Sequence, residues 1–527
     1  MTFRKNTLHR WTRRFFLVLV CTLVAGCSDK VEEFQPQSSQ LVIGSQFDIG
    51  GSVDPRQGLG GPCLAPKLLI YETPVYFDEN YQMQPLLFTA WTPADDAKTW
   101  TVNLRKGVRF TDGTSLSAEA LIFSIRYMAS PGSHLADIGE MKAIDDHTVR
   151  LTLNTPDAVF IHTLSSLPIM SPSCVDQNGH FIQPVGTGPF RFVEYTQGRQ
   201  LVYQRNDDYW GPKPGVEKVV FKFIPDFNTR SMALESGEID IADYLPAEIL
   251  KKLEADSRFT VARKTPSPCP NWIGLNTKRP PFDDVRVRRA ANHAVDVEAI
   301  VERLINAILP GLAVPATRGP HSQPLFADIV HPDLKWYGYD PLAAKRLLAE
   351  AGWQDSDGDG ILDKGGVPLK VELIASLLYA EGTEIAEAVQ SQLAAVGMDV
   401  RVRVLESGAR FQAYREKKYD MIELAGICPH NDPSPWYEYY FHSKKQRAYC
   451  VIENPAIDAE IDRLAETVDE EARRQVFHRL QALLEETAPG IFLYIQKGAM
   501  AFRSDLKGFK SHCGMSGAFS YARFVHR

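Results

Sequence analysis

Residues 85–114, PLLFTAWTPADDAKTWTVNLRKGVRFTDGT, carry the clearest fold signal in the chain. From 99 to 112 apolar and polar residues alternate, which is the pattern of a half-buried strand. Asp112-Gly113 then marks a turn, so the stretch predicts a hairpin. A helix is expected directly after it, over 116–129, with Ser117 as its N-cap.

The remainder of the chain mixes strands and helices. Strands are expected at 41–48, 148–153, 216–225, 369–374, 399–405 and 419–424. From Pro281 onward helices dominate, and they are expected over 284–308, 340–351, 381–396, 455–465 and 470–487. Residues 490–509 return to strand character. The pattern predicts an α/β protein.

The length of the chain predicts more than one hydrophobic core. Single cores stop growing near roughly 250–300 residues, and this chain has 527. Two α/β lobes are expected, with the chain crossing between them near 265–275 and back near 488–495. A multiple crossover of this kind is a hinge, and it forms a cleft that closes on ligand.

Composition excludes some classes of partner and of anchor. The chain is 44% hydrophobic and 23% charged, with a net charge of -7 and a pI near 6.0. Nucleic acid is therefore not expected as a partner, because binding phosphates needs a basic face. No segment after residue 30 is apolar over the roughly 20 residues that a membrane-spanning helix needs.

The N-terminus reads as an export signal. A basic region precedes an apolar stretch from Phe15 to Val24, which is too short to span a membrane. Ala25-Gly26-Cys27 follows and resembles the bacterial lipobox. We therefore expect a lipoprotein signal peptide over 1–27, lipid on Cys27 and a polar tether over 28–40. A plain secretory peptide with an incidental cysteine is the alternative.

The export route and the target membrane stay open. Arg13-Arg14 followed by Phe15-Phe16-Leu17 resembles a twin-arginine signal, although basic leaders often contain this pair. Ser28 follows the lipid cysteine where inner-membrane retention favours aspartate, so sorting to the outer membrane is an alternative that Asp29 leaves unsettled.

Five blocks resemble the family 5 extracellular solute-binding proteins, which include dipeptide, oligopeptide and nickel binders. They occur in the family's order and cover nearly the whole mature chain: 85–114, VGTGPF at 185–190 with NDDYWG at 206–211, LESGEIDIA at 234–242, NTKRPPFDDVRVRRAANHAVD at 276–296 and YDPLAAKRLLAEAGW at 339–353. Most of these residues read as scaffold. Gly186 and Gly188 flank a sharp turn, and Tyr209 and Trp210 read as apolar anchors.

The resemblance implies a two-lobed α/β fold of the type II periplasmic binding proteins, in its large cluster C form, with an extra subdomain. It places lobe I at 41–72, 185–267 and 490–527, the inserted subdomain at 73–184 and lobe II at 268–489. The ligand cleft is expected between the lobes, and a monomer is expected.

The function implied is that of the periplasmic substrate-binding component of an ABC importer, with the permease and ATPase complex as partner. Small peptides are the first expectation for the ligand. A nickel or other metal chelate is the alternative within the family, and an extracytoplasmic sensor module without a transport role is the alternative outside it. No enzyme is expected, because His-Glu-x-x-His, Gly-x-Ser-x-Gly and the Walker phosphate loop are all missing from the sequence.

The ligand is expected at the loop within 419–436, YDMIELAGICPHNDPSPW. Oligopeptide binders of the family carry an aspartate here that pairs with the peptide's α-ammonium. This chain has His430 at that place and Ile427 where a stacking tryptophan would be. The expected contacts are Ile427, Cys428, Pro429, His430 and Asp432, and Asp432 could replace the missing aspartate only if the loop shifts.

Six cysteines remain in the mature chain after the lipid-bearing one, which allows up to three disulfides. The resemblance implies a Cys269–Cys428 disulfide, which would tie one side of the hinge to the ligand loop. The pairing of Cys63, Cys174, Cys450 and Cys513 stays open.

The sequence suggests two candidate metal sites. His430 could contact a metal, but a lone histidine more often forms a hydrogen bond. Asp355, Asp357 and Asp359 alternate with small residues as in a calcium loop, but the twelfth position is Gly366 and not glutamate. Calcium at this loop is the one cofactor considered; otherwise none is expected.

Overall fold

The computed structural model describes residues 40–57, 61–78, 80, 82–131, 133–264, 269–321, 326–376, 382–424, 432–445, 451–507 and 509. The expected signal peptide, the lipid site Cys27 and the tether up to residue 39 lie outside this range. Residues 41–527 form one compact unit. No helix within the described ranges is long and apolar enough to cross a membrane.

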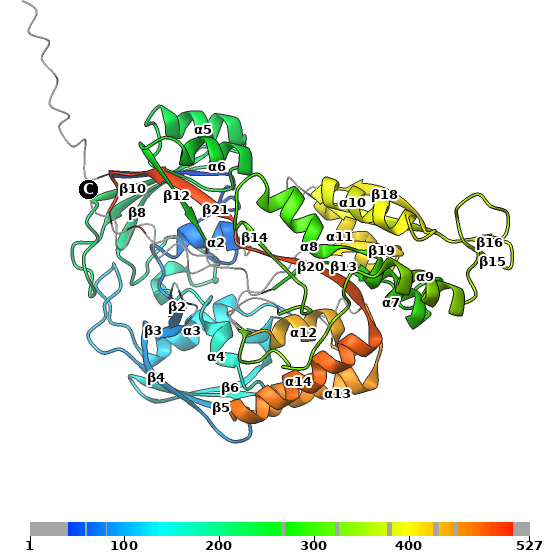
Figure 1. Cartoon of the computed structure of the whole chain (residues 1–527). Helices are drawn as coiled ribbons and strands as arrows, with labels where there is room; N and C mark the ends of the chain where they lie inside the picture. The colour runs from blue at the N-terminus through cyan, green and yellow to red at the C-terminus, as the bar shows by residue number, and fades with distance from the viewer. Residues whose placement is uncertain are drawn as a thin grey trace, which may run out of the picture. The chain divides into compact units, whose positions relative to one another are not determined.

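A seven-stranded sheet forms the core of lobe I (Figure 1). Its order is β12 (Phe259–Arg263), β21 (Ala499–Arg503), β11 (Ile241–Ala242), β1 (Gln40–Ser45), β10 (Lys218–Phe223), β9 (Gln200–Arg205) and β8 (Phe190–Thr196). The helices α5 (Phe227–Glu235) and α6 (Ala247–Glu254) pack against its β11, β12 and β21 strands. Strands from both ends of the chain therefore share one sheet.

The region expected as an inserted subdomain has its own antiparallel sheet. The order is β4 (Phe88–Pro93), β5 (Thr99–Leu104), β7 (Thr148–Leu153) and β6 (Ile138–Asp145). Helix α3 (Ala118–Met128) follows, and Ser117 caps it by accepting the N–H of Ala120. The expected hairpin is shorter than predicted: β5 ends at Leu104, and a single bridge between Arg109 and Ser115 closes the turn at Asp112-Gly113.

A six-stranded mixed sheet forms the core of lobe II. Its order is β14 (Ala313–Pro315), β20 (Gly490–Gln496), β13 (Asn271–Leu275), β19 (Met421–Leu424), β17 (Lys370–Ser376) and β18 (Asp399–Leu405). Its helices are α7 (Val285–Ala294), α8 (Val297–Ile300), a π-helix at Val301–Asn306, α9 (Pro341–Glu350), α10 (Gly382–Ala394), α11 (Ser407–Arg415), α12 (Ser434–Phe441), α13 (Pro455–Glu466) and α14 (Glu470–Thr487). The α/β class and the two-lobed fold are confirmed.

The chain crosses between the two large sheets twice. The first crossing runs from the end of β12 at Arg263 to the start of β13 at Asn271. The second runs from β20 to β21 and contains only Lys497 and Gly498. The boundary predicted at residue 490 is wrong, because β20 pairs with β13 and β14 of lobe II. Lobe I therefore resumes at residue 497.

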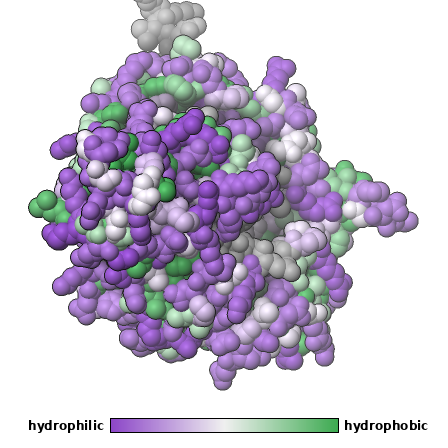
Figure 2. Space-filling model, turned by 90° about the vertical axis from the view of Figure 1, so that its right-hand side faces the viewer, coloured by the Kyte–Doolittle hydropathy of each residue, from purple (hydrophilic) through white to green (hydrophobic). Residues whose placement is uncertain are grey.

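The visible surface is mainly polar. Figure 2 shows a face that is mainly hydrophilic, with apolar residues in small scattered patches. The hairpin of β15 (Asp363–Lys364) and β16 (Val367–Pro368) projects at the right of Figure 1.

Candidate ligand-binding site

The loops expected to carry the ligand leave one edge of the six-stranded sheet. β17 and β19 are parallel, so their carboxyl ends at Ser376 and Leu424 lie together. β13 is antiparallel to β19 with Trp272 opposite Leu424, so its amino end meets the same edge. In open α/β sheets ligands bind outside the carboxyl ends of the strands. The first crossing also enters lobe II here, which places this edge beside the hinge.

Most of the expected contact residues fall outside the described ranges. These are Ile427, Cys428, Pro429 and His430. Cys269 is disulfide-bonded, to a partner that also falls outside them, so its pairing with Cys428 stays a prediction. Cys63 and Cys174 are free thiols. The upper limit of three disulfides therefore falls to two among Cys269, Cys428, Cys450 and Cys513.

Asp432, the last of the expected contacts, is engaged inside lobe II. One carboxylate oxygen accepts the N–H of Ser434 at 2.8 Å, and the other accepts Arg473 Nη2 at 2.8 Å. Burial opposes its negative charge, but Arg473, His162 and the hydrogen bonds from Ser434 together outweigh burial, and the pKa of Asp432 falls to about 2. Nη2 of Arg473 also donates to Ser434 Oγ. The carboxylate thus holds the start of α12 to α14.

The expected inserted subdomain touches lobe II next to this ion pair. Ala158 donates its N–H to the Ala465 carbonyl at 2.8 Å. A cavity of about 320 Å³ lies between the two parts, lined by Asp157, Phe160 and Thr163 on one side and by Ser434, Glu438 and Lys445 on the other. The cavity therefore lies at a contact between separate parts of the fold.

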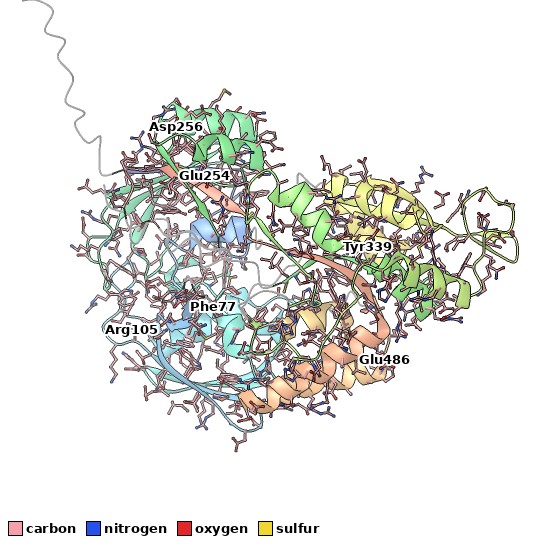
Figure 3. All side chains as sticks on the ribbon, in the orientation of Figure 1. Phe77, Arg105, Glu254, Asp256, Tyr339 and Glu486 are labelled. Atoms are coloured by element: carbon pink, nitrogen blue, oxygen red, sulfur yellow. The ribbon has the colours of Figure 1, made fainter. Side chains whose placement is uncertain are left out.

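Two titratable groups of this contact are strongly shifted. Burial raises the pKa of Asp157 to about 6, and the nearby carboxylates Glu438 and Asp432 add to the effect. Burial lowers the pKa of His162 to about 4, so its imidazole is neutral at pH 7. Its ring packs against Phe77, labelled in Figure 3, with centroids 5.6 Å apart. The contact is therefore sensitive to pH between these values.

Sequence patterns gave no sign of Arg410, which lies on α11 beside the candidate edge. Its side chain is 6% exposed. Nη1 donates to the Glu423 carbonyl at 2.7 Å, whereas Nε has no acceptor. Residues 407–415, SGARFQAYR, would suggest a solvated arginine. Residues of β19 and of α12 line the space around this side chain, and no local signal predicts that packing.

Both segments of the second block, 185–190 and 206–211, form a buried junction with Glu72 in lobe I. The Glu72 carboxylate accepts hydrogen bonds from Thr187 Oγ1 at 3.0 Å, Tyr209 OH at 2.6 Å and Trp210 Nε1 at 2.7 Å. Tyr209 and Trp210 are therefore polar partners and not only the apolar anchors predicted. A Cβ on Gly186 or on Gly188 would lie within 2.4 Å of a backbone carbonyl oxygen, which explains both glycines.

The calcium-like loop is brought together but lies far from this edge in the sequence and in Figure 1. One oxygen each of Asp355, Asp357 and Asp359 lies within 4.8 Å of the others, and all three residues are exposed. The Asp355 carboxylate accepts the N–H groups of Gly358 and Gly360. These turn contacts order the loop without an ion, so calcium there stays a prediction.

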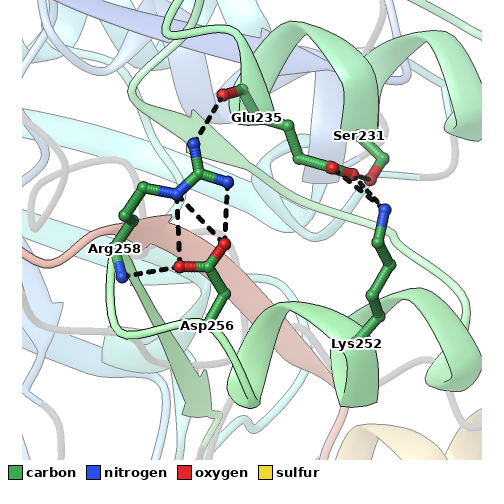
Figure 4. Close-up of polar contacts among 5 residues, drawn as sticks. All are labelled: Ser231, Glu235, Lys252, Asp256 and Arg258. Carbon is green, nitrogen blue, oxygen red and sulfur yellow. Dashed lines mark hydrogen bonds and ion pairs between the residues drawn. The ribbon is translucent and has the colours of Figure 1, made fainter.

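A cluster of charged residues on lobe I compensates itself (Figure 4). Arg258 pairs with Asp256 at 2.7 Å, and Lys252 pairs with Glu235 at 2.9 Å. Neither pair leaves a charge for a ligand. These ion pairs of α5, α6 and the turn after α6 therefore do not mark a ligand site.

Comparison with known proteins gives one consistent result. Residues 82–448 match the model of the bacterial extracellular solute-binding proteins, family 5. The chain is similar to the nickel-binding periplasmic protein of Escherichia coli, with 29% identity over 80% of this chain and 82% of that protein. It is also similar to the oligopeptide-binding protein AppA of Bacillus subtilis, with 27% identity over 84% of each.

A solved structure extends the similarity to the fold. NikA of Brucella suis in complex with Fe(III)-EDTA aligns with a TM-score of 0.79 and 26% identity, covering 91% of this chain and 98% of that one.

Proposed function

Since this chain belongs to the bacterial extracellular solute-binding proteins of family 5, we propose that it is the extracytoplasmic substrate-binding component of an ABC importer. The observation that carries the proposal is the pair of crossings between two large sheets, beside the edge where β13 begins and β17 and β19 end. This arrangement suits a protein that closes on a ligand and then docks on a membrane permease. The family is one of binding proteins, so we infer no chemical change in the ligand.

Closure follows from differential binding. A ligand that touches both lobes stabilises the closed state over the open state, and it can shift the balance only by its difference in affinity for the two. The short second crossing at residues 497–498 limits how the lobes can move. The permease and ATPase would then recognise the closed form.

Peptide is the proposed ligand. The similarity to an oligopeptide-binding protein supports it, as does a disulfide at Cys269, where the proposed partner is Cys428 of the ligand loop. His430 in place of the aspartate argues for a pose in which the peptide's amino terminus is held differently.

A metal chelate is the second candidate. It is favoured by the similarity to a nickel-binding protein and to the NikA complex with Fe(III)-EDTA. His430 would then be the residue nearest to a metal-binding role.

Native mass spectrometry of the full chain, purified without refolding, tests both candidates. Retained peptide masses, displaced by an added tripeptide library, would support the first. A retained metal chelate without peptide would replace it by the second. Absence of any retained or added ligand from the cleft would contradict the binding role itself.

We also propose that the mature protein is exported and held to a membrane by lipid on Cys27, with residues 28–40 as a tether. Labelling of cells with a radioactive fatty acid tests this. Wild-type protein should take up label, and the Cys27→Ser variant should remain unlabelled.

A further inference from the structure

The expected inserted subdomain contacts lobe II away from the two crossings. In Figure 1, α4 (Phe160–Leu164) and α12 lie below the crossings that join the two large sheets. The Ala158 N–H donates to the Ala465 carbonyl at 2.8 Å, and both residues or their neighbours line the cavity of about 320 Å³. The chain enters the subdomain from β1 and leaves it to β8, which both belong to the sheet of lobe I. Opening of the lobes about the crossings would therefore break this contact.

The two sides of the contact belong to different hydrophobic cores. Phe160 and Leu164 of the subdomain are buried in one core together with Phe221 of the lobe I sheet. Trp436 and Ile461 of lobe II are buried in another core. We therefore expect the subdomain to move with lobe I, so that the contact forms when the lobes close and separates when they open.

Two carboxyl groups line the cavity from opposite sides of this contact. Asp157 comes from the subdomain and Glu438 from α12. Asp157 accepts the N–H of Val159 at 3.0 Å, but no lysine, arginine or histidine nitrogen of the described residues lies within 4.0 Å of its carboxyl oxygens. The Glu438 carboxylate has neither a hydrogen bond nor an ion pair with the described residues. Closing the lobes therefore brings like charges together without a counter-ion.

The cations nearest to Asp157 are already paired within lobe II. Arg473 lies 2.8 Å from Asp432, and Lys445 lies 3.6 Å from Asp462. Neither pair leaves a cation committed to Asp157. The titratable and charged side chains around Asp157 are His134, Asp137 and His162 of the subdomain and Asp432, Glu438, Lys445 and Arg473 of lobe II.

We propose that Asp157 takes up a proton when the lobes close, so that closure on a ligand is coupled to pH and is favoured as the pH falls. The inference rests on the proposed binding function and adds a regulation to it. The proton comes from solvent and returns to solvent when the lobes open. A neutral carboxyl group can face Glu438 across the contact at lower cost than a carboxylate can.

The sign of the effect follows from the two states of Asp157. In the contact, burial and then Glu438 and Asp432 raise its pKa to about 6. In the open state water reaches the side chain, and its pKa returns to the ordinary value near 4. The closed state therefore binds more protons between about pH 4 and pH 6, and closure becomes stronger as the pH falls through this range.

His162 lies beside Asp157 but is not expected to set this dependence. Its ring packs against Phe77 of the same subdomain, so opening of the lobes leaves that packing in place. The two lobe II groups that act on its pKa, Asp432 and Arg473, have opposite signs. His162 should therefore titrate alike in the open and closed states, and His162→Gln is a control for Asp157.

The first test needs no ligand. The Ala158 N–H is hydrogen-bonded across the contact, so its protection against hydrogen exchange, corrected for the intrinsic pH dependence of exchange, measures closure in the full chain. Wild-type protection should rise about 10-fold from pH 7.5 to pH 5. Asp157→Asn keeps an oxygen for the Val159 N–H and should be well protected at both pH values.

Two further variants show where the effect arises. Glu438→Gln removes the like charge from the opposite side, so its rise in protection should be smaller than that of wild type. Asp146→Asn, at an exposed aspartate of the same subdomain, should behave as wild type. Equal wild-type protection at both pH values, or the same rise in Asp157→Asn as in wild type, would overturn the inference.

The second test uses calorimetric titration with trialanine at pH 5, in two buffers with different heats of ionisation. Wild type and His162→Gln should each take up about 0.8 proton per bound peptide, and Asp157→Asn close to none. Binding to wild type without proton uptake, or loss of uptake in His162→Gln and not in Asp157→Asn, would contradict the inference. If trialanine does not bind at all, the peptide ligand fails, and the exchange experiment alone decides whether closure is coupled to protons.

Discussion

Glu72 and Arg410 are both charged side chains removed from water, yet the fold treats them in opposite ways. Glu72 is fully buried and accepts three hydrogen bonds from side chains more than 100 positions away in the chain. Arg410 is nearly as buried and donates one hydrogen bond to the residues that the structure describes. The first is satisfied by the fold alone, whereas the second is not.

The difference is one of hydrogen-bond saturation. A buried charge that the fold saturates contributes to stability through its network, and removing one partner leaves others stranded. A buried charge that the fold leaves unsaturated costs stability. Saturation therefore distinguishes these two side chains where burial does not.

The largest expected effect is at the saturated site. Glu72→Gln would replace one acceptor oxygen by an NH2 group that faces Tyr209 or Trp210, both of which are donors. We expect the free energy of unfolding to fall by about 3–5 kcal/mol. Urea denaturation measures it, with Glu140→Gln on the exposed face of β6 as the control. A loss below about 1 kcal/mol would show that Glu72 is not a structural hub.

A second substitution would create another unsaturated arginine. Asp432→Asn removes the carboxylate from Arg473, which keeps its carbonyls but loses its counter-charge. We expect a loss of about 2–4 kcal/mol. Thermal unfolding can measure this loss of stability in place of urea denaturation. Glu466→Gln, at an exposed glutamate, is the matched control. An unchanged midpoint would mean that the carbonyls alone satisfy Arg473.

A third effect depends on pH. The raised pKa of Asp157, about 6, means that its charge disfavours the folded state above pH 6, whereas below about pH 4 it is protonated in both states. Asp157→Asn should therefore stabilise the protein at pH 7.5, by up to about 3 kcal/mol, and have little effect at pH 4.

His162 acts in the opposite direction and must be separated from it. Its pKa is lowered to about 4, so its contribution to stability is present above pH 6.5 and is lost as the pH falls toward 4. Urea titrations of wild type, Asp157→Asn and exposed Asp146→Asn across this range separate the two groups. Equal gains for Asp157→Asn at both pH values would rule out titration of Asp157 as the cause.

The smallest effect concerns charges that are not buried at all. At the exposed loop of Asp355, Asp357 and Asp359, calcium would bind with millimolar affinity. Adding about 5 mM calcium should raise the thermal midpoint by roughly 1–2 °C. Magnesium is the control ion, and Asp357→Asn should abolish the shift. No shift in wild type would leave the loop as a turn held by its own hydrogen bonds.

Elements with strong local signals could be predicted from the sequence. Helix α14 was expected over 470–487 and lies there, because Asp469 caps it and Val476, Phe477, Leu480 and Leu484 form one buried stripe. Helix α12 was missed, since SPWYEYYF has the aromatic content of a strand. Its rings pack around Trp272, with Tyr440 at 5.3 Å and Phe441 at 5.5 Å, and this long-range packing makes it helical.

The candidate site was less predictable than the fold. β20 reads as a strand, but only its partners β13 and β14 show that it belongs to lobe II. The donors that converge on Glu72 come from two separate segments, 185–190 and 206–211, and nothing local links them to it. Arg410 looks like any surface arginine of a short helix until α12 is placed over it. Whether a buried charged group has all its hydrogen-bond partners depends on tertiary contacts, and a single sequence does not show these contacts.

The two crossings between the lobes differ in length, and this has a use in engineering. Seven residues separate β12 from β13, but only Lys497 and Gly498 separate β20 from β21, with Gly498 at φ +63°. We expect the first, longer crossing to tolerate an inserted fluorescent reporter, because added loop length costs little entropy. The same insertion at 497–498 would uncouple the halves. The first crossing is thus the insertion site to choose for converting this receptor into an optical sensor.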